Sequence, residues 1–133
     1  SLREGHLDLP LSPDRPVDLI SATDVGSVVA ETFQVPRKFN GKEIDLVADR
    51  VSMNKIASVM GRFLSMQVEY RKSEGSAGLQ GSLIDHFHWL EKSGHHGDIG
   101  QTSEFLNRFN IQLTNFRDYL REMKDKVSFD KAA

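Results

Sequence analysis

The sequence contains no cysteine, and this absence removes several kinds of site at once. Disulfide frameworks, thiol nucleophiles and thiolate metal ligands are all excluded. Long hydrophobic runs are also missing: none approaches the roughly 20 residues of a membrane-spanning helix, and no signal-peptide pattern opens the chain. From these absences we expect a cytoplasmic protein without contact with membranes.

An excess of charge of one sign is missing as well. The 17 basic and 19 acidic residues give a net charge of −2 and are mixed along the chain. Nucleic-acid binding usually requires a concentrated positive face, so the charge pattern argues against that role. At 133 residues with 38% hydrophobic residues, the chain has the size and composition of one domain.

Residues 1–16 contain three of the four prolines, at Pro10, Pro13 and Pro16. Each proline lacks a backbone donor and disfavours helix in the residue before it. We therefore predict an extended connector over 1–16, with room for a short strand at Leu7–Leu9. Because the chain begins with Ser1 and this polar segment, we expect it to be a piece of a longer protein.

Hydrophobic periodicity in the rest of the chain predicts about five helices and three short strands, an α/β class of structure that would be α+β as an isolated piece. Serine and threonine before helical stripes are typical N-caps. Residues 127–133 are expected to fray. The predicted strands are 17–20, 44–48 and a short one around Tyr70. Four of the predicted helices have N-caps, which are Ser21 or Thr23, Ser52, Thr102 and Thr114. The remaining predicted helix begins at Leu79.

The helix predicted to begin at Leu79 carries the candidate binding residues. Its core stripe is Leu79, Leu83, Phe87 and Leu90. Beside that stripe a second face combines aromatic and small polar side chains, which can line a pocket for a flat or apolar ligand. The same face can instead be covered by another part of the parent protein or pack under the last helix. The candidate pocket residues are Ser82, His86, Phe87 and Trp89.

Histidines and carboxylates near this helix are of the types that bind zinc and other transition metals. On a helix, however, the side chains of His86 and His88 point about 200° apart around the helix axis, so the two cannot bind the same ion. His95 and His96 lie in a glycine-rich segment, which is more often solvated than coordinating. We therefore assign no metal site, and no catalytic residue, because nothing in the spacing brings an acid, a base or a nucleophile together.

Several stretches taken in order resemble the C-terminal part of an NmrA-like protein, a member of the atypical short-chain dehydrogenase/reductase superfamily. Each stretch alone is a weak signal, and their shared order carries the resemblance. The stretches are LPLSPDRPVDLISATDVGSVVAETF, KFNGKEIDLVAD, SMNKIASVMGRFLSMQVEY, DHFHWLEKSGHHGDI and TNFRDYL.

The resemblance implies that residues 17–126 form the substrate-side lobe of a Rossmann-type protein. Its strand at 44–48 would extend a larger sheet, and NAD(P) would be bound by a missing N-terminal half. We assign the family's glycine-rich phosphate-binding turn to that half, and expect this chain alone to bind no cofactor. The superfamily's Tyr-x-x-x-Lys pair is absent, since Glu74 follows Tyr70 and Met123 follows Tyr119 at that spacing.

Three functions stay open on this basis. The parent protein is an NAD(P)-dependent reductase of small organic substrates, with His86, Phe87 and Trp89 near the substrate. Alternatively, it is a non-catalytic NAD(P) redox sensor that regulates partner proteins through the same lobe. The third alternative is a stand-alone interaction domain. The expected partners are the missing half and either a small substrate or a regulatory protein.

Overall fold

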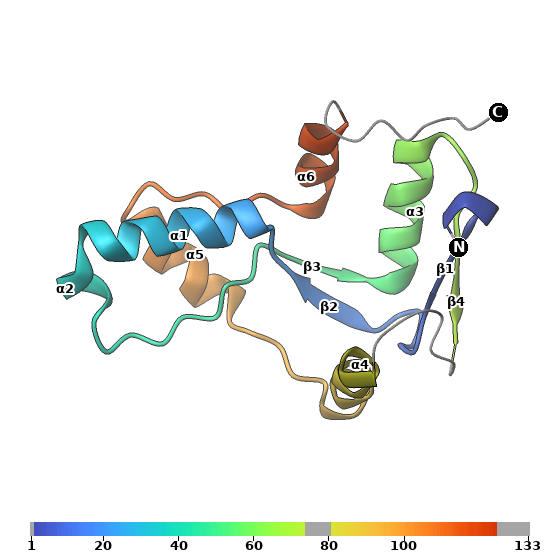
Figure 1. Ribbon diagram of the computed structural model, residues 1–133, viewed down its shortest axis with the longest axis horizontal. Coiled ribbons are helices and arrows are strands. Elements are labelled where there is room, and N and C mark those ends of the chain that lie inside the picture. The colour runs from blue at the N-terminus through green and yellow to red at the C-terminus, as the bar shows by residue number, and fades with distance from the viewer. Residues whose placement is uncertain (1, 74–80, 125–133) are drawn as a thin grey trace. The chain divides into compact units, whose positions relative to one another are not determined.

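A computed structural model of the chain describes residues 2–73 and 81–124, and Figure 1 shows their helices and strands. The chain forms two compact units, which are Ser1–Val17 with Arg50–His96 (unit 1) and Asp18–Asp49 with Gly97–Ala133 (unit 2). Unit 1 holds the 3-10 helix η1 (Leu2–Glu4), β1 (His6–Leu9), α3 (Met53–Leu64), β4 (Glu69–Lys72) and α4 (Gly81–Ser93). Unit 2 holds α1 (Ala22–Gln34), α2 (Pro36–Phe39), α5 (Ile99–Asn107) and α6 (Phe116–Met123). The boundary falls within β2 (Pro16–Leu19) and within β3 (Asp49–Ser52), which pair as a two-stranded sheet.

Unit 1 is built on a parallel pair of strands. β1 pairs with β4 from His6 opposite Glu69 to Leu9 opposite Lys72, and α3 packs against β4. Ser52 is the N-cap of α3, because its hydroxyl accepts the Lys55 amide hydrogen bond at 3.3 Å. The core of the unit consists of Leu11, Met53, Ala57 and Tyr70, with seven partly buried hydrophobic residues around them.

Unit 2 has a separate core in which aromatic rings dominate. Ser21 is the N-cap of α1, and its hydroxyl accepts the Asp24 amide hydrogen bond at 3.0 Å. Val28 of α1, Phe39 of α2 and Leu106 of α5 are buried together. The Phe39 ring lies 5.4 Å from Phe105 and 4.8 Å from Phe109, within the range of favourable aromatic pairs.

The strand predicted at 44–48 is wrong. Residues 42–47 have no regular secondary structure, and the strand that does form is β3, which begins at Asp49. Ile44 and Leu46 pack against the unit 2 core, and Val47 is buried. The alternation of hydrophobic residues therefore reflects packing of a loop against a core instead of pairing in a sheet. The strands predicted at 17–20 and around Tyr70 are confirmed as β2 and β4.

Two predicted helix starts are also wrong. Asp98, not Thr102, caps α5 by accepting the Gln101 amide hydrogen bond at 2.9 Å, while Thr102 is buried inside the helix. Asn115, not Thr114, caps α6. The starts at Ser21 and Ser52 are confirmed. The described residues hold six α-helices, one 3-10 helix and four strands instead of five helices and three strands.

The predicted connector over 1–16 is structured at its start, where η1 and β1 occupy most of residues 2–9. Its expected short strand at Leu7–Leu9 is confirmed within β1. Residues 127–133 and Leu79 lie outside the described residues. In the described part of the chain, no helix has the length and hydrophobicity needed to cross a membrane.

Candidate functional site on helix α4

The predicted pocket residues of α4 lie mostly on an exposed face of unit 1. Ser82 and His86 are exposed, and half of the Trp89 surface (50%) is open to solvent. Phe87 is half-buried and packs against the unit 1 core, and its ring centroid lies 6.3 Å from that of His86. The structure thus brings His86 and Trp89 together on an exposed surface.

His86, Trp89 and His95 form a row of rings that we call the α4 aromatic surface. The His86 and Trp89 rings are stacked, with centroids 5.9 Å apart and an interplanar angle of 24°. The Trp89 and His95 centroids are 5.6 Å apart. Sequence spacing predicted the first pair, whereas His95 joins the row because the chain turns at Gly94, whose φ is +61°.

The predicted core stripe of α4 is confirmed only in its second half. Phe87 and Leu90 pack against the unit 1 core, but Leu83 is 42% exposed. Among the residues that the structure describes, no group of three or more histidine, aspartate or glutamate side chains is arranged to hold a metal ion.

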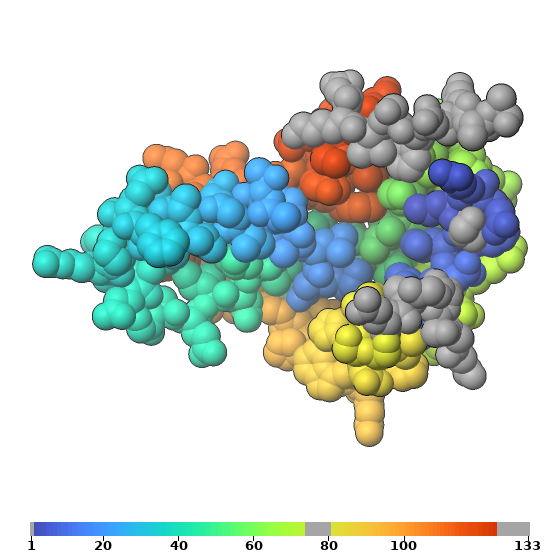
Figure 2. Space-filling model, in the orientation of Figure 1, coloured from blue at the N-terminus to red at the C-terminus, as the bar shows by residue number. Residues whose placement is uncertain are grey.

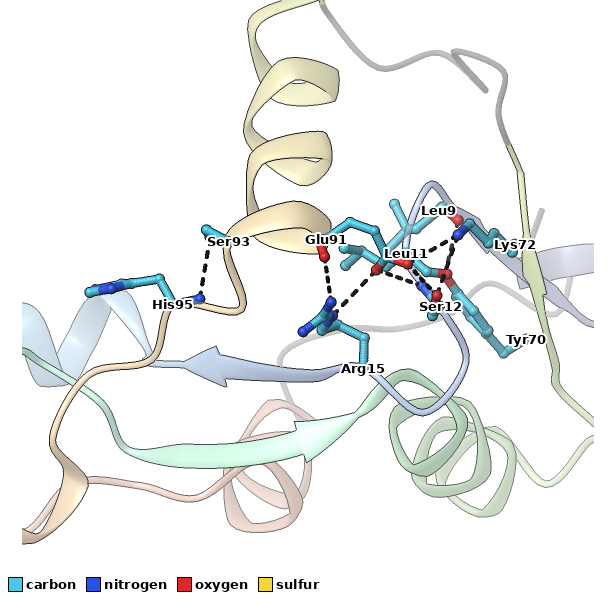
Figure 3. Close-up of polar contacts among 9 residues, drawn as sticks. All are labelled: Leu9, Leu11, Ser12, Arg15, Tyr70, Lys72, Glu91, Ser93 and His95. Atoms are coloured by element: carbon cyan, nitrogen blue, oxygen red, sulfur yellow. Dashed lines mark hydrogen bonds and ion pairs between the residues drawn. The ribbon is translucent and has the colours of Figure 1, made fainter.

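The last turn of α4 is fixed by a polar cluster of Ser12, Arg15, Lys72 and Glu91, shown in Figure 3 and called the Glu91 cluster. The Glu91 carboxylate accepts hydrogen bonds from the Ser12 amide at 3.0 Å and from the Ser12 hydroxyl. Lys72 Nζ lies 3.1 Å from Oε1, and Arg15 Nε lies 3.4 Å from Oε2. Arg15 also donates to the Glu91 carbonyl, which satisfies an acceptor at the helix end.

These donors lower the pKa of Glu91 to about 2. The main cause is the Ser12 hydroxyl, followed by the Ser12 amide, and the positive charge of Lys72 adds to both. Each of these contacts favours the charged form of the carboxylate. Glu91 is thus ionised at neutral pH and holds α4 against the Ser12 segment, so that the α4 aromatic surface rests on an anchored helix.

Tyr70 is not available for acid–base chemistry. Its phenol oxygen lies 2.7 Å from the Leu11 carbonyl oxygen and 2.9 Å from that of Leu9, so its single proton is committed to the backbone. Burial raises the pKa of Tyr70, and the negative charges of Glu91 and Asp8 raise it further. The phenol therefore stays neutral at physiological pH and serves the core of unit 1.

Unit 2 contains a separate apolar cavity of about 220 Å³ at the carboxyl end of β2. Two of the three hydroxyl side chains in its wall are engaged, because Ser21 caps α1 and Thr114 donates to Asp24 at 3.1 Å, and the third belongs to Tyr119. The cavity is suited to a small apolar group. It is lined by Leu19, Ile20, Ser21, Ala22, Thr114, Phe116 and Tyr119.

Sequence reasoning missed the Glu91 cluster, because Arg15 lies 76 residues and Ser12 lies 79 residues from Glu91 along the chain.

Sequence reasoning also missed a glycine pattern. Gly75, Gly78 and Gly81 have the spacing G-x-x-G-x-x-G between β4 and α4, the order typical of dinucleotide-binding turns. Gly75 and Gly78 lie outside the described residues. β4 differs from the strand of such a turn, because three of its four residues are exposed, whereas a central parallel strand is buried and apolar.

The NmrA-like family matches residues 2–119. The chain belongs to the NmrA-like family. The family inferred from the sequence is confirmed, and the matched region includes most of the predicted connector at 1–16.

Solved structures of NmrA share this fold. A mutant NmrA, NmrA described as a negative transcriptional regulator in complex with NAD, and the same regulator in complex with NADP each match with a TM-score of 0.64 and 19% sequence identity. Each match covers 91% of this chain and 43% of the NmrA chain, so the chain spans less than half the length of these relatives. No curated protein matches the sequence.

Proposed function

We propose that the chain is the C-terminal, substrate- or partner-binding part of an NmrA-like protein whose other part binds NAD(P). Two facts support this: the chain belongs to the family, and it spans 43% of the length of NmrA proteins that were solved with NAD and NADP. In this view residues 17–126 form the lobe, and the cofactor is bound by residues outside this chain.

The C-terminal position is supported by the segment after β1. A nucleotide-binding half opens with a strand, a glycine-rich turn and a helix. Here β1 instead leads into a segment with Pro10 and Pro13, and the next regular element is another strand, β2. The glycine pattern at 75–81 comes after the exposed strand β4, which is a poor match to the buried strand that precedes a phosphate-binding turn.

The function that we favour is binding of a regulatory protein in an NAD(P)-responsive parent, without catalysis by this chain. The observation that supports this function is the exposed Trp89 on α4, a helix that Glu91 anchors. The Trp89 ring is flanked by the rings of His86 and His95. Exposed aromatic residues on rigid elements are typical of protein interfaces, where tryptophan contributes much of the binding energy. Tyr70, the one buried tyrosine among the described residues, is committed to the backbone.

A second candidate is an NAD(P)-dependent reductase of small organic substrates, favoured by the unit 2 cavity. Its volume of about 220 Å³ is below the roughly 300–1,000 Å³ of most ligand pockets, so it would accept only a small apolar group. In that case Tyr119 and Phe116 would contact the substrate, and the α4 aromatic surface would face the missing half.

Turnover by the parent protein separates the two candidates. The parent, saturated with NADPH, is incubated with a panel of aldehydes and ketones while absorbance of the reduced nicotinamide is followed. Tight nucleotide binding without oxidation of NADPH supports the regulatory role. Sustained oxidation that Ala22→Phe abolishes, by filling the cavity, supports the reductase instead.

The position of the cofactor site is tested with the 133-residue chain alone by calorimetric titration with NADPH. We expect no saturable binding at millimolar nucleotide. Micromolar binding that Gly78→Ala removes and Gly26→Ala leaves intact would overturn the C-terminal assignment and move the cofactor site to 75–81. Gly26 is a suitable control because it lies on exposed α1, with open space around it.

A further inference from the structure

The surface of unit 2 carries a groove that the proposed function does not use. It has a volume of about 660 Å³ and lies between the second half of α1, α2 and the loop that follows α2. These segments form the cyan and teal surface in Figure 2. We call it the α1–α2 groove. It is lined by Val28, Val29, Thr32, Pro36, Arg37, Phe39, Asn40, Gly41, Lys42, Ile44 and Leu46.

The floor of the groove is hydrophobic and partly open to water. Val29 is 43% exposed, and Phe33, one helical turn further along α1, is 81% exposed. Phe33 is the most exposed of the large hydrophobic side chains among the described residues. An open phenylalanine beside an apolar groove is a surface that gains from burial by a partner.

The rim of the groove is positively charged. Arg37 and Lys42 line it, Lys38 is exposed between them in the sequence, and the lining includes no acidic side chain. The ion pairs that the structure describes in unit 2 involve Arg108 and Arg121, and neither Arg37 nor Lys42 pairs with a described residue. The groove thus combines an apolar floor with cations that pair with no carboxylate among the described residues.

We propose that the α1–α2 groove binds an acidic peptide segment of another protein. Apolar anchor residues of that segment occupy the floor and contact Phe33, while its carboxylates pair with Arg37 and Lys42. Charge complementarity selects this occupant, because the uncompensated cations attract a carboxylate-bearing chain. A second copy placed symmetrically would bring the same cations together, which disfavours self-association through this groove. The groove is independent of the α4 aromatic surface.

The experiment titrates the 133-residue chain into a fluorescently labelled peptide of about 12 residues in which glutamates alternate with leucine and phenylalanine. A matched peptide has lysine in place of each glutamate. We expect saturable micromolar binding of the acidic peptide, and at least about tenfold weaker binding of the basic one, because close opposite charges steer and stabilise association. Affinity should fall as salt is raised and the charges are screened.

Variants assign the binding to the groove. Arg37→Glu with Lys42→Glu should weaken the acidic peptide at least about tenfold by placing like charges opposite it, and Phe33→Ser should weaken it without changing the salt dependence. The matched control is Arg117→Glu with Lys124→Glu, the same charge change at exposed positions outside the lining, which should alter affinity less than about twofold. Circular dichroism checks folding of each variant.

Three results would overturn the assignment to an acidic peptide. One is that neither peptide binds, or that both bind equally. Another is that the control pair weakens binding as much as the groove pair. The third is that the chain dimerises in sedimentation and the groove pair abolishes the dimer, which would make a second copy the occupant.

Discussion

The Asp24 carboxylate accepts two hydrogen bonds from Thr114, a residue 90 positions later in the chain. The Thr114 amide lies 2.8 Å from Oδ2, and the Thr114 hydroxyl lies 3.1 Å from Oδ1. Asp24 is only 6% exposed and stands in the first turn of α1, where the helix dipole also favours its negative charge. This pair joins the start of α1 to the segment that leads into α6.

Asp24→Ala should lower the free energy of unfolding by about 2–3 kcal/mol, because two partly buried donors of Thr114 would lose a charged acceptor. Urea denaturation of the chain measures the change. The control is Asp14→Ala, which removes an exposed carboxylate bonded to Asn54 and should cost less than about 1 kcal/mol. Equal losses in the two variants would contradict the structural role of Asp24.

The Asp24–Thr114 pair shows which features of this chain could be predicted. Ser21 and Ser52 were identified as caps because a cap depends on residues three positions away. The threonine and asparagine at 114 and 115 both fit a cap, and only the distant Asp24 decides that Thr114 faces elsewhere. The same limit explains why His86 and Trp89 were paired correctly while the contacts of Glu91 were missed. The spacing of residues along the sequence predicts which side chains share a helix face, but it does not predict contacts between distant segments.

The Glu91 cluster makes stability depend on pH in the acidic range. The folded pKa of Glu91, about 2, lies below its ordinary value of 4.5, so the folded state favours the ionised form. Its contribution is complete above pH 4.5 and is lost as the pH falls toward 2. A shift of this size corresponds to at most about 3 kcal/mol, and we expect about 2 kcal/mol because the side chain is partly solvated.

Comparison of the wild type with Glu91→Gln at several pH values isolates this contribution. The variant should be about 2 kcal/mol less stable at about pH 6, and the difference should shrink steadily between about pH 5 and pH 2. The control is Glu104→Gln, which removes an exposed ion pair with Arg108. It should lower the free energy of unfolding by less than about 0.5 kcal/mol at every pH tested. A difference that stays constant with pH would show that Glu91 acts by packing alone.

Two helical glycines should respond to alanine in opposite directions. A Cβ at Gly61 in α3 would lie 2.8 Å from the Met66 carbonyl oxygen, where the backbone cannot easily move. At Gly26 in α1, no atom lies within 4 Å of such a Cβ. Gly61→Ala should therefore destabilise the chain by about 1–3 kcal/mol, while Gly26→Ala should stabilise it by about 0.5–1 kcal/mol through helix propensity. Thermal melts of both variants check the signs, and stabilisation by Gly61→Ala would show that the α3 end is loosely packed.

The α4 aromatic surface predicts a separation between stability and binding. Trp89 is 50% exposed, whereas Phe87, two residues earlier on the same helix, packs into the unit 1 core. Trp89→Ala should therefore lower the free energy of unfolding of the chain by less than about 1 kcal/mol, and Phe87→Ala by about 2–4 kcal/mol.

In the parent protein the order should reverse for function. Trp89→Ala should weaken binding of the regulatory protein or substrate by at least about tenfold, as expected for a central aromatic contact. A conservative Trp89→Phe should restore part of that affinity, since a ring can still stack on His86. Melting temperature and binding are measured on the same preparations. If Trp89→Ala reduces both in proportion, the surface is part of the fold and not a binding site.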